Sequence, residues 1–360
     1  MPMTNCATRT LFDRGVAIIS IDTEQIWGYL NSFNEAQFQA RYPNSLEAHG
    51  RLLTSLQVSG VSATWFVVGG MALRSSIGAH DRRMAGIPLA WKSQIPTGDE
   101  CRAPLWYRHS FVRHLTDALP LQEVGLHGGL THLIWTDALA TPEVVNWELA
   151  EGIKALEEVH VRPCSFSYGW DQEAYHEILP SQGIRVYRGR TPVFAYRLGR
   201  TIPGALLRAF DELTSATPPT VWPVEVLPGL WNIPSSLFLY PMARWRTRVI
   251  RLRSRIQRFQ KGLERACRLK GIFHFCLHPE NLVESKSGFA VWEDILDRLI
   301  RARDRGDVEI LTMSEAVSRI ERCRESSSYS SWLHPPAEAT ASADCTIGTA
   351  ARFKQSCPET

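Results

Sequence analysis

Short runs of β-branched and aromatic residues alternate along this chain with longer segments of helical periodicity. This alternation is typical of βαβ units, which place their strands side by side in a parallel sheet. No segment of about 20–50 residues repeats, so a solenoid or propeller is not expected. Seven runs suit a (β/α) barrel or an open, doubly wound sheet. The predicted strands are Val16–Ile21, Ala63–Val68, Glu123–Leu126, Ser165–Tyr168, Ile184–Tyr187, Ile272–Leu277 and Val308–Leu311.

The length of 360 residues allows two domains of ~150 residues, or one α/β barrel with a tail. Residues 70–107 lack a clear period and residues 190–240 are rich in proline. We therefore expect one catalytic barrel over residues 1–324 with insertions near 70–107 and 190–240. A low-complexity, poorly ordered tail is expected over residues 325–360. Helices are predicted at Leu46–Val58, Ser110–Ala118, Pro142–His160, Gln172–Leu179, Ala243–Leu269 and Val291–Arg303, with a last helix opened by a capping box at Thr312–Glu315.

The cysteines and the N-terminal residues bear on cellular location. Eight cysteines are scattered without a C-x-x-C pair, which favours reduced thiols over a disulfide framework or a zinc ribbon. Asp13 and Arg14 interrupt the first residues, where a signal peptide would need an apolar core. No stretch reaches the ~18 apolar residues of a membrane span. These features predict a cytoplasmic protein.

Polar residues with catalytic potential follow several of the predicted strands. In parallel α/β folds, active residues gather at the carboxyl ends of the strands. A turn-capping Asp or a hydrogen-bonded structural His would leave the same trace at any single position. Taken together, carboxylates and histidines at strand ends are the inventory of a mononuclear metal site with an acid/base pair. These residues are the two carboxylates Asp22 and Glu24 and the three histidines His127, His132 and His278.

Four sequence blocks in a fixed order resemble the polysaccharide deacetylase family. VAIISIDTEQIWG is similar to the first family motif, and SATWFVVGG to the "ATFF" strand. EVGLHGGLTH is similar to the metal-binding motif, and FHFCLHPENL to the last motif, a strand that ends in Leu-His. The nearest resemblance is to a subgroup with the pattern S-x-D-T-E-x-x-W-G, associated with exopolysaccharide biosynthesis. The resemblance implies a distorted (β/α) barrel of about seven parallel strands and metal-dependent removal of acetyl groups from an N-acetylated sugar.

The resemblance also implies a role for each matching residue. Asp22 takes the place of the catalytic base and His278 that of the catalytic acid. His127 and His132 take the place of the metal-binding histidines. The family's second Asp is Thr23 here, so Glu24 is the candidate third ligand of a divalent metal, with zinc expected.

Two further functions remain open at this point. The first is hydrolysis of another amide by the same fold, without a metal. The second is carbohydrate binding by a catalytically degenerate member. It is favoured by the third motif, FSYGWD, which lacks the family's Arg that orients the base.

The chain contains 12 tryptophans, and three follow strand ends. Indole faces stack on the C–H faces of sugar rings, so Trp27, Trp135 and Trp170, together with Asp171, are candidate substrate-binding residues. Packing in the core is the alternative for each tryptophan.

Residues 244–270 form a strongly basic segment of amphipathic pattern. Eleven Lys or Arg residues and one acid give it a charge of +10, although the whole chain carries +3. One interpretation is a solvated helix whose apolar stripe packs on the barrel. The other is contact with an anionic membrane such as the inner leaflet, with a lipid-linked intermediate, or with an acidic polysaccharide. No nucleic-acid-binding motif accompanies these charges, so the expected partner is a carbohydrate and not a nucleic acid.

Overall fold

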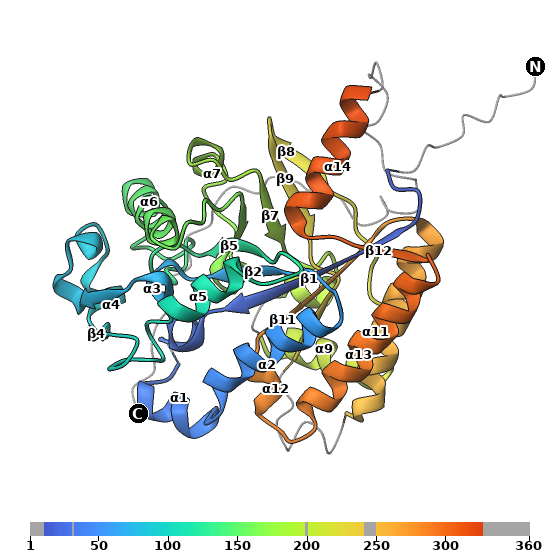
Figure 1. The fold of residues 1–360 in the computed structure, drawn as a ribbon, viewed down its shortest axis with the longest axis horizontal. Helices are drawn as coiled ribbons and strands as arrows, with labels where there is room; N and C mark the ends of the chain where they lie inside the picture. The colour runs from blue at the N-terminus through green and yellow to red at the C-terminus, as the bar shows by residue number, and fades with distance from the viewer. Residues whose placement is uncertain (1–10, 31, 199–200, 241–249, 327–360) are drawn as a thin grey trace, which may run out of the picture.

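The computed structural model describes residues 11–30, 32–198, 201–240 and 250–326, and its centre is a curled, mostly parallel sheet (Figure 1). The six strands named below pair in parallel with one another. For example, Val16 lies opposite Ile272 in one strand pair, and Leu126 lies opposite Phe166 in another. Buried β-branched and aromatic side chains on both faces are expected for such a sheet. The strands follow in the order β11 (Ile272–Leu277), β1 (Gly15–Thr23), β2 (Thr64–Val67), β5 (Glu123–His127), β6 (Ser165–Ser167) and β7 (Val186–Gly189).

One extended segment joins the two ends of this sheet. Its first part, β9 (Leu230–Pro234), pairs with β7, and its second part, β10 (Leu237–Leu239), pairs with β11. Between them, the Ser235 amide donates to Gly189 on one side and the Ser236 amide donates to His274 on the other. The β9–β10 segment is thus the seventh strand of the barrel. The result is the predicted distorted (β/α) barrel of about seven parallel strands.

Six of the seven predicted strands belong to the barrel, and the predicted strand at Val308–Leu311 does not. The run predicted at Val308–Leu311 forms β12 (Val308–Ile310), which pairs with the first residues of β1 outside the main strand order. The missing barrel strand is β9–β10, which lies in the proline-rich range where no strand was predicted. Pro234 occupies the last position of β9, where the loss of one amide donor is tolerated. A further strand, β8 (Val224–Leu227), runs antiparallel to β9.

The helices cover the outside of the barrel, and α11 and α13 lie side by side along it (Figure 1). The helix α6 begins as the sequence predicts, because the Thr141 hydroxyl accepts a hydrogen bond from the Val144 amide and Pro142 fills the first turn. The main helices are α2 (Ser45–Val58), α5 (His109–Thr116), α6 (Pro142–Glu157), α9 (Ile202–Leu213), α11 (Leu252–Leu269), α13 (Gly288–Asp304) and α14 (Met313–Ser326).

The helix predicted at Gln172–Leu179 is wrong. A single 3-10 turn, η4 (Gly169–Asp171), is followed by non-helical residues and a short α7 (Ile178–Ser181). Trp170 and Asp171 have φ values of 55° and 54°, which lie in the left-handed region and stop helix propagation. The segment that follows β6 is therefore an irregular loop and not a helix.

The two predicted insertions contain regular elements. Residues 70–107 hold the antiparallel pair β3 (Ser75–Ile77) and β4 (Thr97–Asp99) with short helices α3 (Gly69–Ala72) and α4 (Leu89–Lys92). Residues 190–240 hold α8 (Phe194–Arg197), α9 and three strands. The remaining short elements are η1 (Gln25–Tyr29), α1 (Glu35–Arg41), η2 (Gly78–His80), η3 (Arg82–Met84) and α12 (Glu280–Val283).

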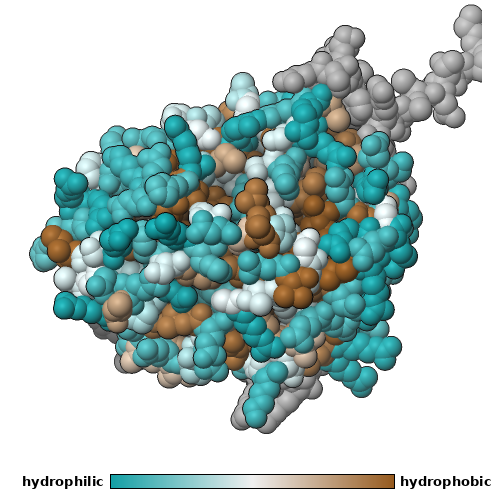
Figure 2. Space-filling model, viewed as in Figure 1, coloured by the Kyte–Doolittle hydropathy of each residue, from teal (hydrophilic) through white to brown (hydrophobic). Residues whose placement is uncertain are grey.

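Several expectations about the chain's ends and surface meet the structure only in part. Helix α14 continues to Ser326, and the rest of the predicted tail lies outside the described residues. Five cysteines, Cys101, Cys164, Cys267, Cys276 and Cys323, are free thiols. Within the described residues, no helix combines the length and apolar character needed to cross a membrane. The face in Figure 2 is mostly hydrophilic, with small apolar groups between.

Candidate active site

The barrel brings five of the predicted residues together at the carboxyl end of its strands. Asp22 and Glu24 come from the end of β1, His127 from the end of β5, and His278 directly follows β11. Glu24 Oε2 lies 3.0 Å from His127 Nε2 and 3.0 Å from His132 Nε2. His278 lies between the carboxylates, with Nδ1 3.0 Å from Glu24 Oε1 and Nε2 3.2 Å from Asp22 Oδ2. These side chains therefore form one contiguous polar cluster.

Glu24, and not Thr23, reaches the two histidines. Its longer side chain bends back over the turn that follows β1 and passes directly above Gly28. A Cβ atom at position 28 would lie 2.1 Å from the Glu24 carboxyl carbon. Only glycine leaves room for the carboxylate there, so the Trp-Gly pair after the Asp-Thr-Glu turn has a packing reason.

A tight loop explains how two histidines five residues apart share one site. Gly128, with φ of +72°, turns the chain immediately after β5, so that His132 folds back toward His127. Their Nε2 atoms lie 3.2 Å apart. The buried Glu148 on α6 holds this loop, because its Oε1 accepts hydrogen bonds from the Thr131 amide at 2.8 Å and the Thr131 hydroxyl at 2.6 Å.

The three side chains fit a divalent cation. His127 Nδ1 lies 3.0 Å from the Ser167 carbonyl, which can only accept, so this nitrogen carries the proton and Nε2 keeps a lone pair. The Nε2 atoms of both histidines and the Glu24 carboxylate oxygen converge at 3.0–3.2 Å, an arrangement in which a cation would satisfy all three. In a tetrahedral zinc site with ~2.0–2.1 Å bonds, neighbouring ligand atoms are about 3.3 Å apart. Glu24, His127 and His132 could thus hold a divalent metal ion.

Asp22 and His278 have opposite pKa shifts. Burial alone would raise the pKa of Asp22, but the Arg188 guanidinium and the nearby histidines hold it well below its usual value. Burial alone would lower the pKa of His278, but the Glu24 and Asp22 carboxylates outweigh it and hold the pKa well above its usual value. At neutral pH, Asp22 is therefore ionised and able to accept a proton, and His278 carries a proton that it can donate.

Arg188, at the end of β7, is the site residue that the sequence did not reveal. Its two terminal nitrogens each donate to one Asp22 oxygen at 2.7 Å, and the side chain is 3% exposed. This bidentate contact fixes the carboxylate plane. The third motif lacks the family's Arg, as the sequence shows, but a different strand supplies an Arg that contacts Asp22. A signal was present, since Arg188 directly follows the predicted strand Ile184–Tyr187.

A buried hydrogen-bond chain supports Arg188 from below. Its Nη1 also donates to Ser20 Oγ at 3.2 Å, and Ser20 Oγ lies 2.9 Å from His274 Nε2. His274 Nδ1 faces the Pro234 carbonyl at 3.2 Å, so that nitrogen carries the proton and Nε2 accepts from the Ser20 hydroxyl. Burial lowers the pKa of His274 to about 3, which keeps it neutral. This chain of hydrogen bonds links β1, β7, β9 and β11 beneath the polar cluster.

The predicted substrate-binding residues lie in different environments. Trp27 and Trp135 are 1% and 2% exposed, and Trp27 Nε1 donates to the Trp106 carbonyl at 2.8 Å. Burial on this scale favours core packing for these two indoles. Trp170 is 36% exposed, and Asp171 lies 3.4 Å from Arg188 Nη2 with its side chain 38% exposed. Trp170 and Asp171 thus lie at the edge of the cluster, where a substrate could reach them.

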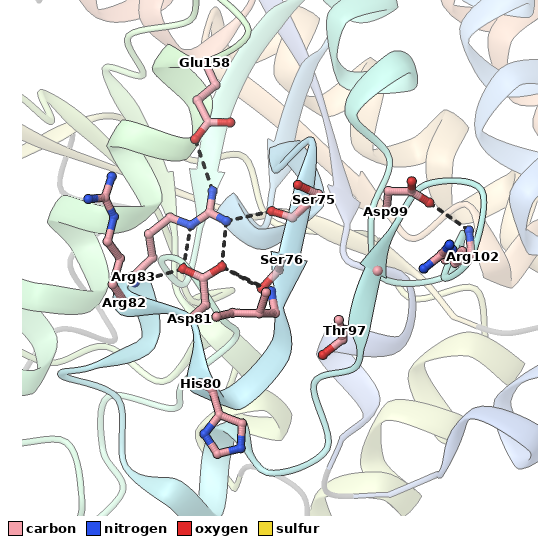
Figure 3. A pocket seen from close by; sticks show the side chains of 12 residues that line it. Ser75, Ser76, His80, Asp81, Arg82, Arg83, Thr97, Asp99, Arg102 and Glu158 are labelled. Atoms are coloured by element: carbon pink, nitrogen blue, oxygen red, sulfur yellow. Dashed lines mark hydrogen bonds and ion pairs between the residues drawn. The ribbon is translucent and has the colours of Figure 1, made fainter.

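A separate hollow of about 720 Å³ lies on the insertion around β3 and β4 (Figure 3). Its charged groups largely satisfy one another: Arg83 donates to Asp81 at 2.7 Å and to Glu158 at 3.2 Å, and the Ser76 hydroxyl bonds Asp81 at 3.0 Å. None of the residues of the polar cluster lines it. We therefore assign the hollow no part in the chemistry.

The support of the His132 loop has a measurable pH signature. Burial raises the pKa of Glu148 from 4.5 to about 7, despite its hydrogen bonds to Thr131. The folded state thus binds this proton more tightly than the unfolded state, and the free energy of unfolding falls as pH rises through this range. Glu148→Gln keeps an acceptor for Thr131 and removes the ionisation. Urea denaturation should show that the drop in stability between pH 6 and pH 8 is about 1 kcal/mol smaller in the variant. Parallel pH profiles for the two proteins would contradict this assignment.

No family model matches the sequence, and no curated protein matches it. Solved structures do match the fold. A protein assigned as a polysaccharide deacetylase from Mycobacterium smegmatis has a TM-score of 0.56 and 18% identity, over 90% of this chain and 96% of its own. Another, from Pseudomonas aeruginosa, has a TM-score of 0.54 and 12% identity, over 86% and 91%. The chain has the fold of these deacetylases. Puue allantoinase is also similar, with a TM-score of 0.53 and 11% identity over 90% and 95%.

Proposed function

We propose that this protein is a hydrolase that removes the acetyl group from an N-acetylated sugar or glycan precursor. The observation that carries the proposal is the convergence of Asp22, His278 and the Glu24–His127–His132 group within one cluster. Amide hydrolysis needs a base to deprotonate water and an acid to protonate the departing amine. The similar folds of proteins assigned as polysaccharide deacetylases support an acetylated sugar as the substrate.

Each residue of the cluster has one task in this reaction. Asp22, held by Arg188, accepts the proton of the attacking water. Its lowered pKa makes it a weak base, so the water itself must be acidified. A divalent cation on Glu24, His127 and His132 would supply that acidity and polarise the acetyl carbonyl. His278 donates its proton to the amine nitrogen as the C–N bond breaks. Trp170 and Asp171 are positioned to contact the sugar at the edge of the cluster.

Acetate release from N-acetylated oligosaccharides tests the proposal. Asp22→Asn and His278→Ala should each lower turnover by about 100-fold or more, since general acid–base catalysis contributes ~10²–10⁴-fold. Glu293→Gln, an exposed change on α13, should leave turnover unchanged. Circular dichroism would check that the variants stay folded. Near-normal acetate release by either site variant would remove its assigned role.

A second candidate is hydrolysis of another amide, and the similar fold of an allantoinase favours it over carbohydrate binding without catalysis. The two enzymatic candidates differ in substrate, so ring amides and N-acetyl sugars should be compared side by side. Carbohydrate binding alone predicts sugar binding with no acetate release. A role in exopolysaccharide biosynthesis and a cytoplasmic location stay predictions from the sequence.

A further inference from the structure

Helix α9 presents its apolar face to solvent and its polar face to the protein. Four large apolar side chains recur at helical spacing, Ile202, Leu206, Phe210 and Leu213, and they are 77%, 67%, 59% and 53% exposed. The buried residues of this helix are Gly204 and Glu212. Phe194 on the preceding α8 is 66% exposed as well. We call these five exposed apolar residues the apolar ridge. Such contiguous exposure on a folded chain marks an interaction surface.

Polar contacts with α11 fix this inverted orientation. The buried Glu212 carboxylate lies 3.8 Å from the Arg255 guanidinium. Beyond the end of α9, Lys261 Nζ donates to the Ser215 carbonyl at 2.7 Å, and Arg258 Nε donates to the Ala216 carbonyl at 3.2 Å. Cations therefore satisfy carbonyls at the C-terminal end of α9. Because these contacts hold α9 by its polar side, the ridge cannot turn inward without breaking them.

The contacts also divide the basic segment into two sets. Arg255 and Arg258 are buried structural partners of α9. The other cations of α11 are exposed, and Lys261, Arg265 and Arg268 share one face of the helix by their spacing. Lys261 on this face is the cation that contacts the segment after α9. Arg244, Arg246 and Arg248 lie outside the described residues. For Arg255 and Arg258, the structural interpretation of the basic segment therefore holds.

The apolar ridge follows closely in the sequence after β7, the strand that carries Arg188. Helix α8 begins five residues after Gly189, the last residue of β7, and Arg190 bonds the Asp171 carbonyl at 2.9 Å. A surface that engages Phe194 would therefore lie near the connection that leaves the site.

We propose that the apolar ridge and the exposed cations of α11 dock this protein on an anionic lipid surface. Apolar side chains on one face, flanked by Lys and Arg, are the pattern of helices that lie in the membrane interface. Anionic headgroups attract each nearby cation, and the ridge enters the acyl boundary. A second copy would bring the same positive charge to the contact and be repelled. A glycan can stack its C–H faces on a single aromatic ring, but it offers no continuous apolar partner for a row of three aliphatic side chains and one Phe. The docking proposal is independent of the reaction proposed above.

Co-sedimentation of the full chain with vesicles tests this docking. Wild-type protein should bind phosphatidylcholine vesicles that contain phosphatidylglycerol far better than vesicles of phosphatidylcholine alone, and added salt should weaken the binding. Leu206→Glu combined with Phe210→Glu should lower the partition coefficient about 100-fold, because two large side chains no longer bury in lipid. Arg265→Gln combined with Arg268→Gln should lower it about 30-fold on anionic vesicles alone.

A matched control is Val58→Glu, which alters an equally exposed apolar residue on α2 and should leave vesicle binding unchanged. All changed positions are exposed, so circular dichroism should show the folded state in each variant. Failure of the wild-type protein to bind anionic vesicles at low salt would overturn the proposal. It would also be overturned if the ridge variant bound vesicles normally and instead converted a dimer to a monomer in light scattering, since the ridge would then be a contact between copies.

Discussion

Replacing Arg188 by Ala should lower turnover by about 100-fold or more and the free energy of unfolding by ~3–5 kcal/mol. Removing one partner of a buried, hydrogen-bonded ion pair leaves the other charge uncompensated, which accounts for the loss of stability. Here the stranded group is Asp22, which loses two hydrogen bonds of 2.7 Å and the cation that keeps its pKa low. Asp22 would then be partly protonated and free to rotate, and both changes impair a base.

A conservative variant separates charge from geometry. Arg188→Lys keeps the positive charge but cannot make two parallel hydrogen bonds, so its turnover should lie between those of the wild type and the Ala variant. Arg185→Ala is the matched control, because this neighbouring Arg is half exposed and pairs with Glu321 at the surface. That change should cost less than ~1 kcal/mol and leave turnover intact. Urea denaturation and initial-rate kinetics give both quantities. Full activity in Arg188→Ala would show that Asp22 needs no orienting partner.

Replacing His127 by Ala should abolish stable zinc binding. The wild-type protein is expected to hold roughly one zinc ion per chain after dialysis, as a three-ligand site allows. Loss of a direct ligand should weaken the affinity by more than the ~10–100-fold that loss of a supporting residue costs. Elemental analysis and zinc titration of the purified proteins measure this without reference to activity. His132→Ala should behave in the same way, since its Nε2 lies the same 3.0 Å from Glu24.

The control for metal binding is His114→Ala, which removes an exposed histidine on α5 that is not part of the cluster. It should keep the full metal content. Wild-type zinc content in His127→Ala would show that the Glu24–His127–His132 group is not the metal site. Metal-free wild-type protein with full amide hydrolysis would instead favour metal-independent catalysis. The zinc measurement therefore separates the two enzymatic candidates.

Much of the fold could be predicted because local sequence decides which residues form strands. Each of six barrel strands is a buried apolar run in the sequence. The polar residues that follow these runs lie at the same edge of the sheet. The positions of Asp22, Glu24, His127 and His278 follow from this rule alone. The seventh strand was missed because β9–β10 is short, contains Pro234 and pairs with a different neighbour in each half.

Glycines near the site show where local reasoning ends. The turn at Gly128 could be expected, since two consecutive glycines after a strand favour a tight loop. The role of Gly28 could not, because it depends on the path of the Glu24 side chain over the backbone. The burial of Trp27 and Trp135 depends likewise on neighbours from distant segments, such as Trp106.

The sequence by itself determined six of the seven barrel strands and the polar residues that end them, because these depend on the pattern of a few adjacent residues. Only the tertiary structure decided that Arg188 holds Asp22, which lies 166 positions away, and that α9 exposes its apolar side. Closure of the barrel brings β7 opposite β1 and α11 against α9. The sequence can mark Arg188 as a polar residue at a strand end, but it does not reveal its partner, since pairing depends on contacts between segments that are distant in the chain.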